Sequence, residues 1–173
     1  LTAGDLTYEA EDEADKKYGM MEWDLPNKIS TFKIRLEGDA ELYGFCLTGD
    51  KGVAVTNIGL RGSSGTFFTK IDAKSFKYMH NALNTRLVIM EFGGNATPYL
   101  STDKKIEGYY NSMDAQIKFV KQQLPKAKII LIGPADMAET VDGKLQTYRN
   151  LEKTVDLMRR VAKDNGVAFW NMY

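Results

Sequence analysis

Cysteine, histidine and net charge are all scarce in this chain, and each scarcity excludes a class of protein. The single Cys46 rules out an internal disulfide framework, and Cys46 with the only histidine, His80, gives too few ligands for the common transition-metal sites. No motif in the sequence indicates a Ca²⁺ or Mg²⁺ site made of carboxylates alone. The 23 basic and 23 acidic residues balance, which argues against nucleic acid and against a polybasic membrane surface as partners. We therefore expect no metal and no cofactor.

Long apolar runs are also missing. No stretch approaches the roughly 20 apolar residues that a membrane-spanning helix needs, so we expect no membrane span. With 173 residues, 43% of them hydrophobic, the chain can nevertheless bury the core of one domain or slightly more. Because Leu1 is not an initiator methionine, we expect the natural N-terminus to have been removed. The composition leaves the oligomeric state open.

The first third of the chain has the pattern of antiparallel β structure. Residues 31–36 alternate apolar and charged side chains, as a half-buried strand does, and residues 42–47 have the composition of a second strand. Close turns containing glycine and aspartate separate these segments from each other and from a third strand that begins at residues 53–55. We predict a β-rich segment over residues 1–50.

From residue 51 onward, strands alternate with helices. Four apolar runs have the composition and length of buried strands, and three longer segments place apolar residues at helical spacing. The predicted strands cover residues 53–57, 87–92, 128–133 and 167–170. The predicted helices cover residues 74–83, about 104–124 and about 145–164, closed in the last two cases by Pro125 and Asn165-Gly166. Such alternation favours right-handed βαβ units, so we predict a three-layer α/β domain with a parallel sheet over residues 51–173.

The turn Gly93-Gly94-Asn95 is the most informative motif. It follows an apolar run, and at the carboxyl end of a parallel strand an asparagine amide can face the crevice where open α/β sheets bind ligands. An N–H donor in such a crevice can stabilise a developing oxyanion. Gly62 follows the preceding predicted strand, and its backbone N–H can act in the same way because a residue without Cβ permits close approach. We predict that Gly62 and Asn95 face one crevice.

The segment Gly62-Ser63-Ser64-Gly65 has alternative interpretations. It differs from the Gly-x-Ser-x-Gly nucleophile elbow and has no evident histidine partner, and it lacks the lysine and the spacing of a phosphate loop. An anion-binding nest and an ordinary turn both stay open. His80 falls on the apolar side of a predicted helix, with no carboxylate nearby to orient it, so we interpret it as a structural or surface histidine.

Several segments, in this order, resemble the SGNH/GDSL hydrolase superfamily, and above all its extracytoplasmic bacterial branch of peptidoglycan and polysaccharide O-acetylesterases. Residues 52–65 resemble the strand and glycine of block II, and residues 87–96 resemble block III, which is most often Gly-x-Asn-Asp. Residues 129–137 resemble the next strand and its substrate-side loop, and residues 167–173 resemble the strand that leads to the catalytic Asp-x-x-His. The likeness covers roughly residues 31–173.

The chain departs from this family pattern in three places. Ala96 stands where block III most often has aspartate. The Gly-Asp-Ser of block I, which carries the nucleophile, is absent, and Gly4-Asp5-Leu6 is only a superficial echo of it. The Asp-x-x-His is absent as well. The resemblance therefore implies an incomplete flavodoxin-like α/β/α core in a truncated chain, with residues 1–50 as the remnant of an inserted β module. The missing central strand would have to be replaced by another segment or chain.

The resemblance implies a serine ester hydrolase that forms an acyl-enzyme, with its nucleophile and Asp-His pair outside this chain. Gly62 and Asn95 would form the oxyanion hole. Arg61 could contact an anionic glycan, and it could equally be solvent-exposed or part of a structural ion pair. The substrate would be an acylated carbohydrate or another small ester, and the location periplasmic or secreted. This chain alone is expected to be inactive.

A non-catalytic carbohydrate-binding or assembly domain on the same scaffold is the alternative function. In that case exposed aromatic side chains would stack on sugar rings, and the candidates are Tyr8, Tyr18 and Trp23. The same three side chains could instead cover a hydrophobic core. The full reading frame would separate the two functions, because an upstream Gly-Asp-Ser and a downstream Asp-x-x-His favour the enzyme.

Overall fold

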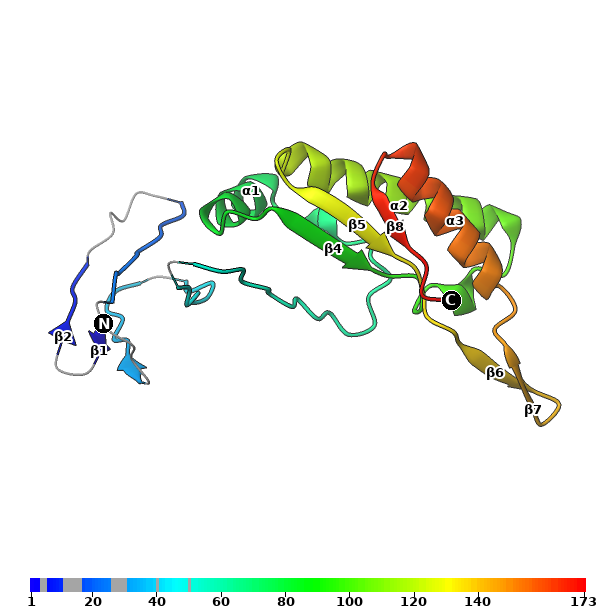
Figure 1. Cartoon of the computed structure of the whole chain (residues 1–173), viewed down its shortest axis with the longest axis horizontal. Helices are drawn as coiled ribbons and strands as arrows, with labels where there is room; N and C mark the ends of the chain where they lie inside the picture. Colours follow the sequence, from blue (N-terminus) through cyan, green and yellow to red (C-terminus); the bar gives the residue numbers. More distant parts are fainter. Residues whose placement is uncertain (4–5, 11–16, 26–30, 40, 50) are drawn as a thin grey trace. The chain divides into compact units, whose positions relative to one another are not determined.

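The chain folds into two compact units, Leu1–Ile58 and Gly59–Tyr173. The computed structural model in Figure 1 describes residues 1–3, 6–10, 17–25, 31–39, 41–49 and 51–173. Gly4 and Asp5, which belong to the Gly4-Asp5-Leu6 echo of block I, lie outside the described residues, as do residues 11–16. No helix in the described ranges has both the length and the apolar character needed to cross a bilayer.

The first unit contains a small antiparallel sheet of order β2-β1-β3. β1 (Thr2–Ala3) pairs with β2 (Leu6–Thr7) on one side and with β3 (Phe32–Lys33) on the other. β3 is the only part of the predicted strand at residues 31–36 that is in a β ladder. Each strand is two residues long, shorter than the strands usual in globular proteins.

The strands predicted at residues 42–47 and 53–57 are wrong. Neither segment has regular structure or pairs with a strand among the residues that the structure describes. Their apolar side chains are exposed, Leu47 to 70% and Val53 to 92%. A strand persists only where a neighbour satisfies its backbone N–H and C=O groups, and the apolar pattern here has no such neighbour.

The second unit is built on a parallel sheet of order β4-β5-β8. β4 (Leu87–Glu91), β5 (Lys128–Ile132) and β8 (Ala168–Trp170) confirm three of the four strands predicted for this sheet. Met90 lies opposite Leu131 in the register of β4 and β5, and Leu131 lies opposite Phe169 in the register of β5 and β8. The three strands place their carboxyl ends at one edge of the sheet, as parallel strands do.

Three α-helices connect or follow these strands. α1 (Ala73–Ala82) and α2 (Asp103–Gln123) lie close to their predicted bounds. Each begins at a side-chain cap, because Asp72 accepts from the Ser75 N–H and Thr102 accepts from the Lys105 N–H. α3 (Leu151–Asp164) ends at Asn165 and at Gly166, whose positive φ of 61° suits a C-terminal cap. Two short 3₁₀ helices, η1 (Phe68–Lys70) and η2 (Thr97–Tyr99), complete the unit.

The third helix begins later than predicted because a hairpin occupies its expected first turn. β6 (Ala138–Val141) and β7 (Lys144–Thr147) pair antiparallel across the turn Asp142-Gly143. Both turn residues have positive φ, 52° and 75°. Asp-Gly is a preferred pair for the tight turn that requires this geometry. The prediction of a helix from residue 145 is therefore wrong as far as residue 150.

The hydrophobic core lies between one face of the sheet and helices α2 and α3. Met90 and Leu131 from the strands are almost completely buried against residues of these two helices. The fully buried helical side chains include Met113, Ile117 and Val120 of α2, and Met158 and Val161 of α3. Burying such side chains stabilises a fold by roughly 1.5–3 kcal/mol each before the loss of conformational entropy is counted.

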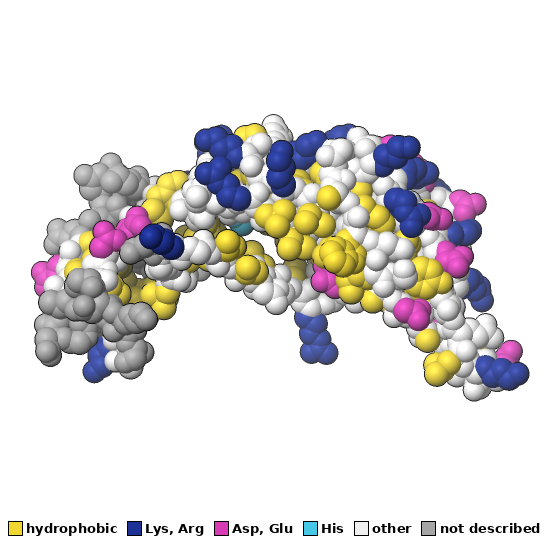
Figure 2. Space-filling view, viewed as in Figure 1, with side chains coloured by type: hydrophobic (Ala, Val, Ile, Leu, Met, Phe, Trp, Pro, Cys, Tyr) yellow, Lys and Arg dark blue, Asp and Glu magenta, His cyan; other side chains and the backbone are white. Residues whose placement is uncertain are grey.

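The opposite face of the sheet is open among the described residues. Leu87 and Ile89 of β4 are 48% and 55% exposed, and Trp170 of β8 is 64% exposed. Alternate residues of a strand point to opposite faces, so these side chains lie on the face away from Met90 and Leu131. Figure 2 shows hydrophobic side chains gathered over the strands on this side. The described residues thus supply the sheet and one helical layer of the α/β core.

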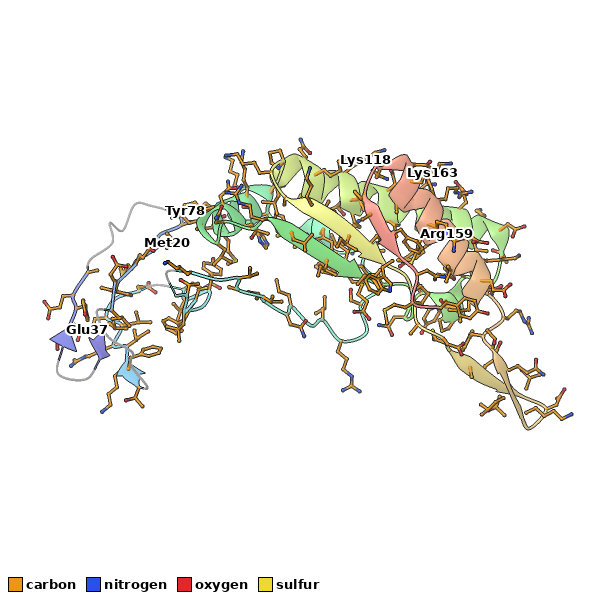
Figure 3. All side chains as sticks on the ribbon, in the orientation of Figure 1. Met20, Glu37, Tyr78, Lys118, Arg159 and Lys163 are labelled. Atoms are coloured by element: carbon orange, nitrogen blue, oxygen red, sulfur yellow. The ribbon has the colours of Figure 1, made fainter. Side chains whose placement is uncertain are left out.

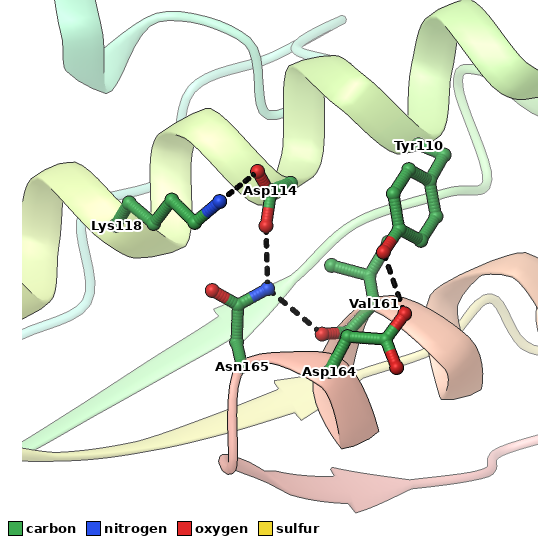
Figure 4. Close-up of polar contacts among 6 residues, drawn as sticks. All are labelled: Tyr110, Asp114, Lys118, Val161, Asp164 and Asn165. Atoms are coloured by element: carbon green, nitrogen blue, oxygen red, sulfur yellow. Dashed lines mark hydrogen bonds and ion pairs between the residues drawn. The ribbon is translucent and has the colours of Figure 1, made fainter.

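Polar contacts join α2 to the end of α3 (Figure 4). The Asn165 amide donates to Asp114 Oδ1 at 2.9 Å and to the Val161 carbonyl at 3.0 Å. Lys118 Nζ lies 2.7 Å from the other carboxylate oxygen of Asp114. The hydrogen bond from Lys118, assisted by that from Asn165, holds the pKa of Asp114 below its ordinary value. The buried Asn165 is therefore the centre of a small network that fixes the two helices together.

A second set of contacts links the same helices nearer the surface. Tyr110 donates to Asp164 Oδ2 at 2.6 Å, and Arg160 lies over the Tyr110 ring and 2.8 Å from Glu107. Figure 3 labels three cationic side chains of these helices, Lys118 of α2 and Arg159 and Lys163 of α3. Exposed ion pairs of this kind stabilise a fold little, so we assign the larger effect to Asn165.

Replacing Asn165 with alanine should lower the free energy of unfolding by about 1–3 kcal/mol. The change removes two hydrogen bonds and leaves the Val161 carbonyl without its side-chain donor. Urea denaturation followed by far-UV circular dichroism measures the difference. Asn111→Ala, an exposed asparagine on α2, is the matched control and should change little. Equal stability of the two variants would contradict the importance of the network.

Candidate functional site

A crevice opens at the carboxyl ends of β4 and β5. It encloses about 570 Å³, which lies in the range typical of small-molecule sites. Parts of three segments of the Gly59–Tyr173 unit line it: residues 62–63, residues 91–99 and residues 134–137. This is the edge at which open α/β sheets bind their ligands.

The structure places Gly62 and Asn95 on this one crevice, as the sequence predicts. Asn95 Nδ2 donates to the Ser63 carbonyl at 3.1 Å, so the amide lies beside the residue that follows Gly62. Gly62 has a φ of +75°, and its N–H makes no hydrogen bond within the described part of the chain. The crevice therefore brings together an amide and a free backbone donor, and their chemical role stays a prediction.

The turn that carries Asn95 is held by three hydrogen bonds to the Gly93 carbonyl. The Ala96 and Thr97 N–H groups donate to it at 3.0 and 2.8 Å, and the buried Thr97 hydroxyl donates at 2.9 Å. Gly93 has a φ of +103°, and a Cβ there would lie 2.7 Å from Met158 Sδ. The turn can pack this tightly on α3 only because Gly93 has no side chain.

The segment around Gly62 is positioned by α2. The Tyr109 hydroxyl donates to the Ser64 carbonyl at 2.8 Å, and the Gln116 side chain makes two hydrogen bonds with Thr69. Burial raises the pKa of Tyr109, so its hydroxyl stays protonated as a donor. These contacts place Gly62 near Asn95 although no strand forms at residues 53–57.

A cluster of aromatic side chains packs beside the segment that contains Gly62 and Gly65. Phe67 and Phe68 both lie edge-on to Phe92, with ring centroids 6.2 Å apart in each case. A Cβ at Gly65 would lie only 2.5 Å from the Phe92 ring, so this glycine permits close approach of the loop to the end of β4. The loop is thereby packed on the residue that directly precedes the Asn95 turn in the sequence.

His80 does not line the crevice. Its Nδ1 lies 3.1 Å from the Thr85 hydroxyl, and its ring centroid lies 4.3 Å from that of Phe76. Burial lowers the pKa of His80 from its ordinary value. This environment agrees with the interpretation of His80 as a structural residue, because its contacts within the described part of the chain lie away from the crevice and include no carboxylate.

The serines near Gly62 are engaged in their own loop. Ser63 Oγ accepts from the Gly65 N–H at 3.1 Å, and Ser64 Oγ lies 3.3 Å from the Thr66 hydroxyl. Ser63 lines the crevice, but no histidine does. The described residues also contain no group of three or more histidine, cysteine or acidic side chains that could hold a metal ion.

Other predicted contact residues lie away from the crevice lining. Arg61 is exposed and is not among the residues that line the crevice. Tyr8, Tyr18 and Trp23 belong to the first unit and are half-buried. Their role in stacking on sugars stays a prediction.

Glu91 and Tyr99 also line the crevice, although the sequence analysis does not single them out. Glu91 is the last residue of β4, and Tyr99 lies four residues after Asn95. Both follow from the rule that ligands bind beyond the carboxyl ends of parallel strands, since each is close in sequence to the end of β4. The apolar pattern predicts the strand, but it does not predict a role for individual side chains at or after the end of the strand.

No protein-family model matches this sequence, and no curated protein does. Solved structures do. A peptidoglycan O-acetylesterase is similar with a TM-score of 0.54 at 21% identity, over 64% of this chain and 31% of that chain. The chain thus spans about a third of the length of that enzyme. This likeness shows a shared fold, a parallel α/β sheet flanked by helices.

Two further structures are similar over parts of their length. An acetyl xylan esterase has a TM-score of 0.42 at 16% identity, covering 59% of this chain and 54% of that chain. The periplasmic domain of a lipopolysaccharide acetyltransferase from Salmonella ser. Paratyphi A also has a TM-score of 0.42, at 11% identity, covering 58% of this chain and 44% of that chain.

Alanine should be tolerated at Gly94 but not at Gly93. Gly93→Ala combines a left-handed backbone with a Cβ 2.7 Å from Met158 Sδ and 2.8 Å from Pro134, so we expect a loss of about 2–4 kcal/mol in stability. A Cβ at Gly94 meets only Met137 Sδ, at 3.8 Å. Thermal and urea unfolding of the two variants measure the difference. If both variants unfold alike, the turn is not packed on α3 as described.

The His80 environment predicts a loss of stability as pH falls. Its pKa in the folded chain lies below the value of about 6.5 expected in the unfolded chain, so the unfolded chain takes up the proton first. The free energy of unfolding should therefore decrease as pH falls through 6.5 to the folded-state pKa. In His80→Gln this component should vanish, which unfolding curves at pH 7.5 and 5.5 measure. Parallel pH dependence in the two proteins would rule out this burial effect.

Proposed function

We propose that this chain supplies the oxyanion-binding half of an SGNH-type serine ester hydrolase that acts on acylated carbohydrates. The observation that carries the proposal is that the free Gly62 N–H and the Asn95 amide line one crevice at the carboxyl edge of the sheet. Donors held in place before the reaction stabilise the charge that develops on the carbonyl oxygen of an ester under attack. The fold shared with a peptidoglycan O-acetylesterase supports the reaction class.

Within the described part of the chain, the Asn95 amide has one N–H left for this purpose. Its Nδ2 donates one hydrogen bond to the Ser63 carbonyl, which orients the amide, and an amide nitrogen carries two N–H groups. An oxyanion would need to lie about 2.7–3.1 Å from the second N–H and from the Gly62 N–H. If Asn95 stabilises the oxyanion, its hydrogen bond to the Ser63 carbonyl fixes the orientation of the amide before the ester binds.

The proposal assigns the serine nucleophile and the Asp-His pair to a part of the protein outside these 173 residues. Ser63 uses its Oγ to accept from Gly65, and His80 is turned toward Thr85 and Phe76. In the intact site the serine would attack the ester carbonyl, and the histidine would take its proton and return it to the leaving alcohol. The acyl-enzyme would then be hydrolysed by water.

The proposed substrate is an O-acylated glycan, and the proposed location is periplasmic or secreted. The likeness to an enzyme that acts on peptidoglycan, which lies outside the cytoplasm, supports both. Arg61 is exposed and directly precedes Gly62. We therefore propose that its side chain contacts an anionic group of such a glycan. A non-catalytic glycan-binding domain is the competing function, and it needs the crevice but not the oxyanion donors.

Asn95→Ala tests the oxyanion assignment in a polypeptide that also carries the serine and the histidine. We expect kcat/KM for p-nitrophenyl acetate to fall about 10²–10³-fold, while the folded state is retained. Asn81→Ala, an exposed asparagine on α1, is the matched control and should keep full activity. If Asn95→Ala lowers the melting temperature and leaves the activity per folded molecule unchanged, Asn95 only caps a turn and the proposal fails.

The 173-residue chain alone should not hydrolyse p-nitrophenyl acetate faster than an unfolded control protein. No serine–histidine pair occurs among the residues that the structure describes, so we expect no efficient acyl-enzyme route in this chain. Saturable turnover that a serine-directed inhibitor abolishes would locate the nucleophile within the chain, and Ser63 and Ser64 would be tested first.

A further inference from the structure

Tyr99 lines the crevice beside Phe92, and unlike Phe92, which is half-buried, its side chain is 73% exposed. Its hydroxyl makes no hydrogen bond within the described part of the chain, and its ring is outside the buried core cluster. A single exposed aromatic residue on a smooth surface needs no explanation. An unpacked ring on the wall of a crevice of about 570 Å³ is different, because a ligand in the crevice would cover it.

The backbone that carries this ring is rigid. Tyr99 ends the 3₁₀ helix η2, in which Pro98 fixes one backbone angle. The Tyr99 N–H donates to the Ala96 carbonyl at 2.9 Å, and the neighbouring Leu100 is buried in the core. Residues on both sides of the ring are therefore anchored, and the ring is presented to solvent from a fixed position. A surface held in place in this way binds without the cost of ordering it first.

The loop after β5 and the end of β4 supply further groups. Pro134 and Met137 line the crevice from the loop after β5 and give it apolar surface. Glu91 lines the same crevice, and a carboxylate accepts hydrogen bonds from hydroxyl groups. The crevice thus combines an aromatic face and a hydroxyl acceptor with the Asn95 amide.

We infer that Tyr99 is the platform on which a pyranose ring of the substrate stacks, with Glu91 accepting a hydroxyl of the same sugar. A pyranose presents C–H bonds on its faces and hydroxyl groups at its edge, and the electron-rich face of an aromatic ring attracts the polarised C–H bonds. A sugar stacked on Tyr99 would have its acyl group beside Asn95, four residues earlier in the same turn. The choice of a carbohydrate as ligand rests on the proposed function.

Titration of the chain with chitohexaose, a β-1,4-linked oligosaccharide, tests this inference directly. We expect the Tyr99 ring protons to shift upfield in nuclear magnetic resonance spectra as the sugar binds. Tyr99→Ala and Tyr99→Leu should raise the dissociation constant roughly tenfold, whereas Tyr99→Phe and Tyr99→Trp should keep it near the wild-type value. The leucine variant separates stacking from simple apolar contact.

Tyr43→Ala is the matched control, because Tyr43 is 65% exposed and lies outside the crevice. Its affinity for chitohexaose should be unchanged. Circular dichroism and melting temperature establish that each variant is folded, and the exposure of Tyr99 makes folding of its variants expected. Wild-type affinity in Tyr99→Ala or Tyr99→Leu would overturn the inference, and so would the absence of binding of both chitohexaose and xylohexaose to the wild-type chain.

A kinetic comparison in the polypeptide that carries the full catalytic set distinguishes this inference from the proposed function. Tyr99→Ala should lower kcat/KM for an O-acetylated oligosaccharide by a larger factor than for p-nitrophenyl acetate, since only the former carries a sugar. Asn95→Ala should lower both and preserve chitohexaose binding. If Asn95→Ala keeps its activity while Tyr99→Ala still loses sugar binding, the oxyanion assignment fails and the sugar platform stands. Equal losses on both esters in Tyr99→Ala would overturn the platform.

Discussion

The packing of α2 and α3 against one face of the β4-β5-β8 sheet is the interaction on which the other features depend. Met90 and Leu131 are buried against both helices, which fixes the sheet edge where the crevice opens. The same helices reach the crevice through their flanks, since Tyr109 of α2 holds the loop at Ser64 and Met158 of α3 lies under Gly93. Core packing and site geometry are therefore parts of one arrangement, and a change in helix position would alter both donors.

Much of this core could be predicted from the sequence because its periodicity is strong. The apolar runs at β4, β5 and β8 and the helical spacing of α1 and α2 each have one favoured structure. The errors arose where local pattern does not determine structure. Residues 53–57 have the composition of a strand but no neighbour to pair with, and the Asp142-Gly143 turn converted an expected first helical turn into a hairpin.

The candidate site was predictable to a smaller extent. The rule that parallel strands end at one edge brought Asn95 to the crevice, and Gly62 reached it for a different reason from the one the sequence suggested. Its position depends on the hydrogen bond between Tyr109 and Ser64, which are 45 residues apart, and no local pattern predicts such a pair. Tyr99 was missed because an aromatic residue in a turn has no periodicity by which to recognise it.

The exposure of Trp170 makes the open face of the sheet detectable by fluorescence. The chain has two tryptophans, and the Trp170 indole is 64% exposed among other uncovered apolar side chains of the sheet. Its fluorescence should have the long emission wavelength of a solvated indole, and anything that covers this face should shift the emission toward the blue. The uncovered face is also a surface on which chains can associate. If chains associate through it, the emission should shift toward the blue as the protein concentration and the molar mass from light scattering increase.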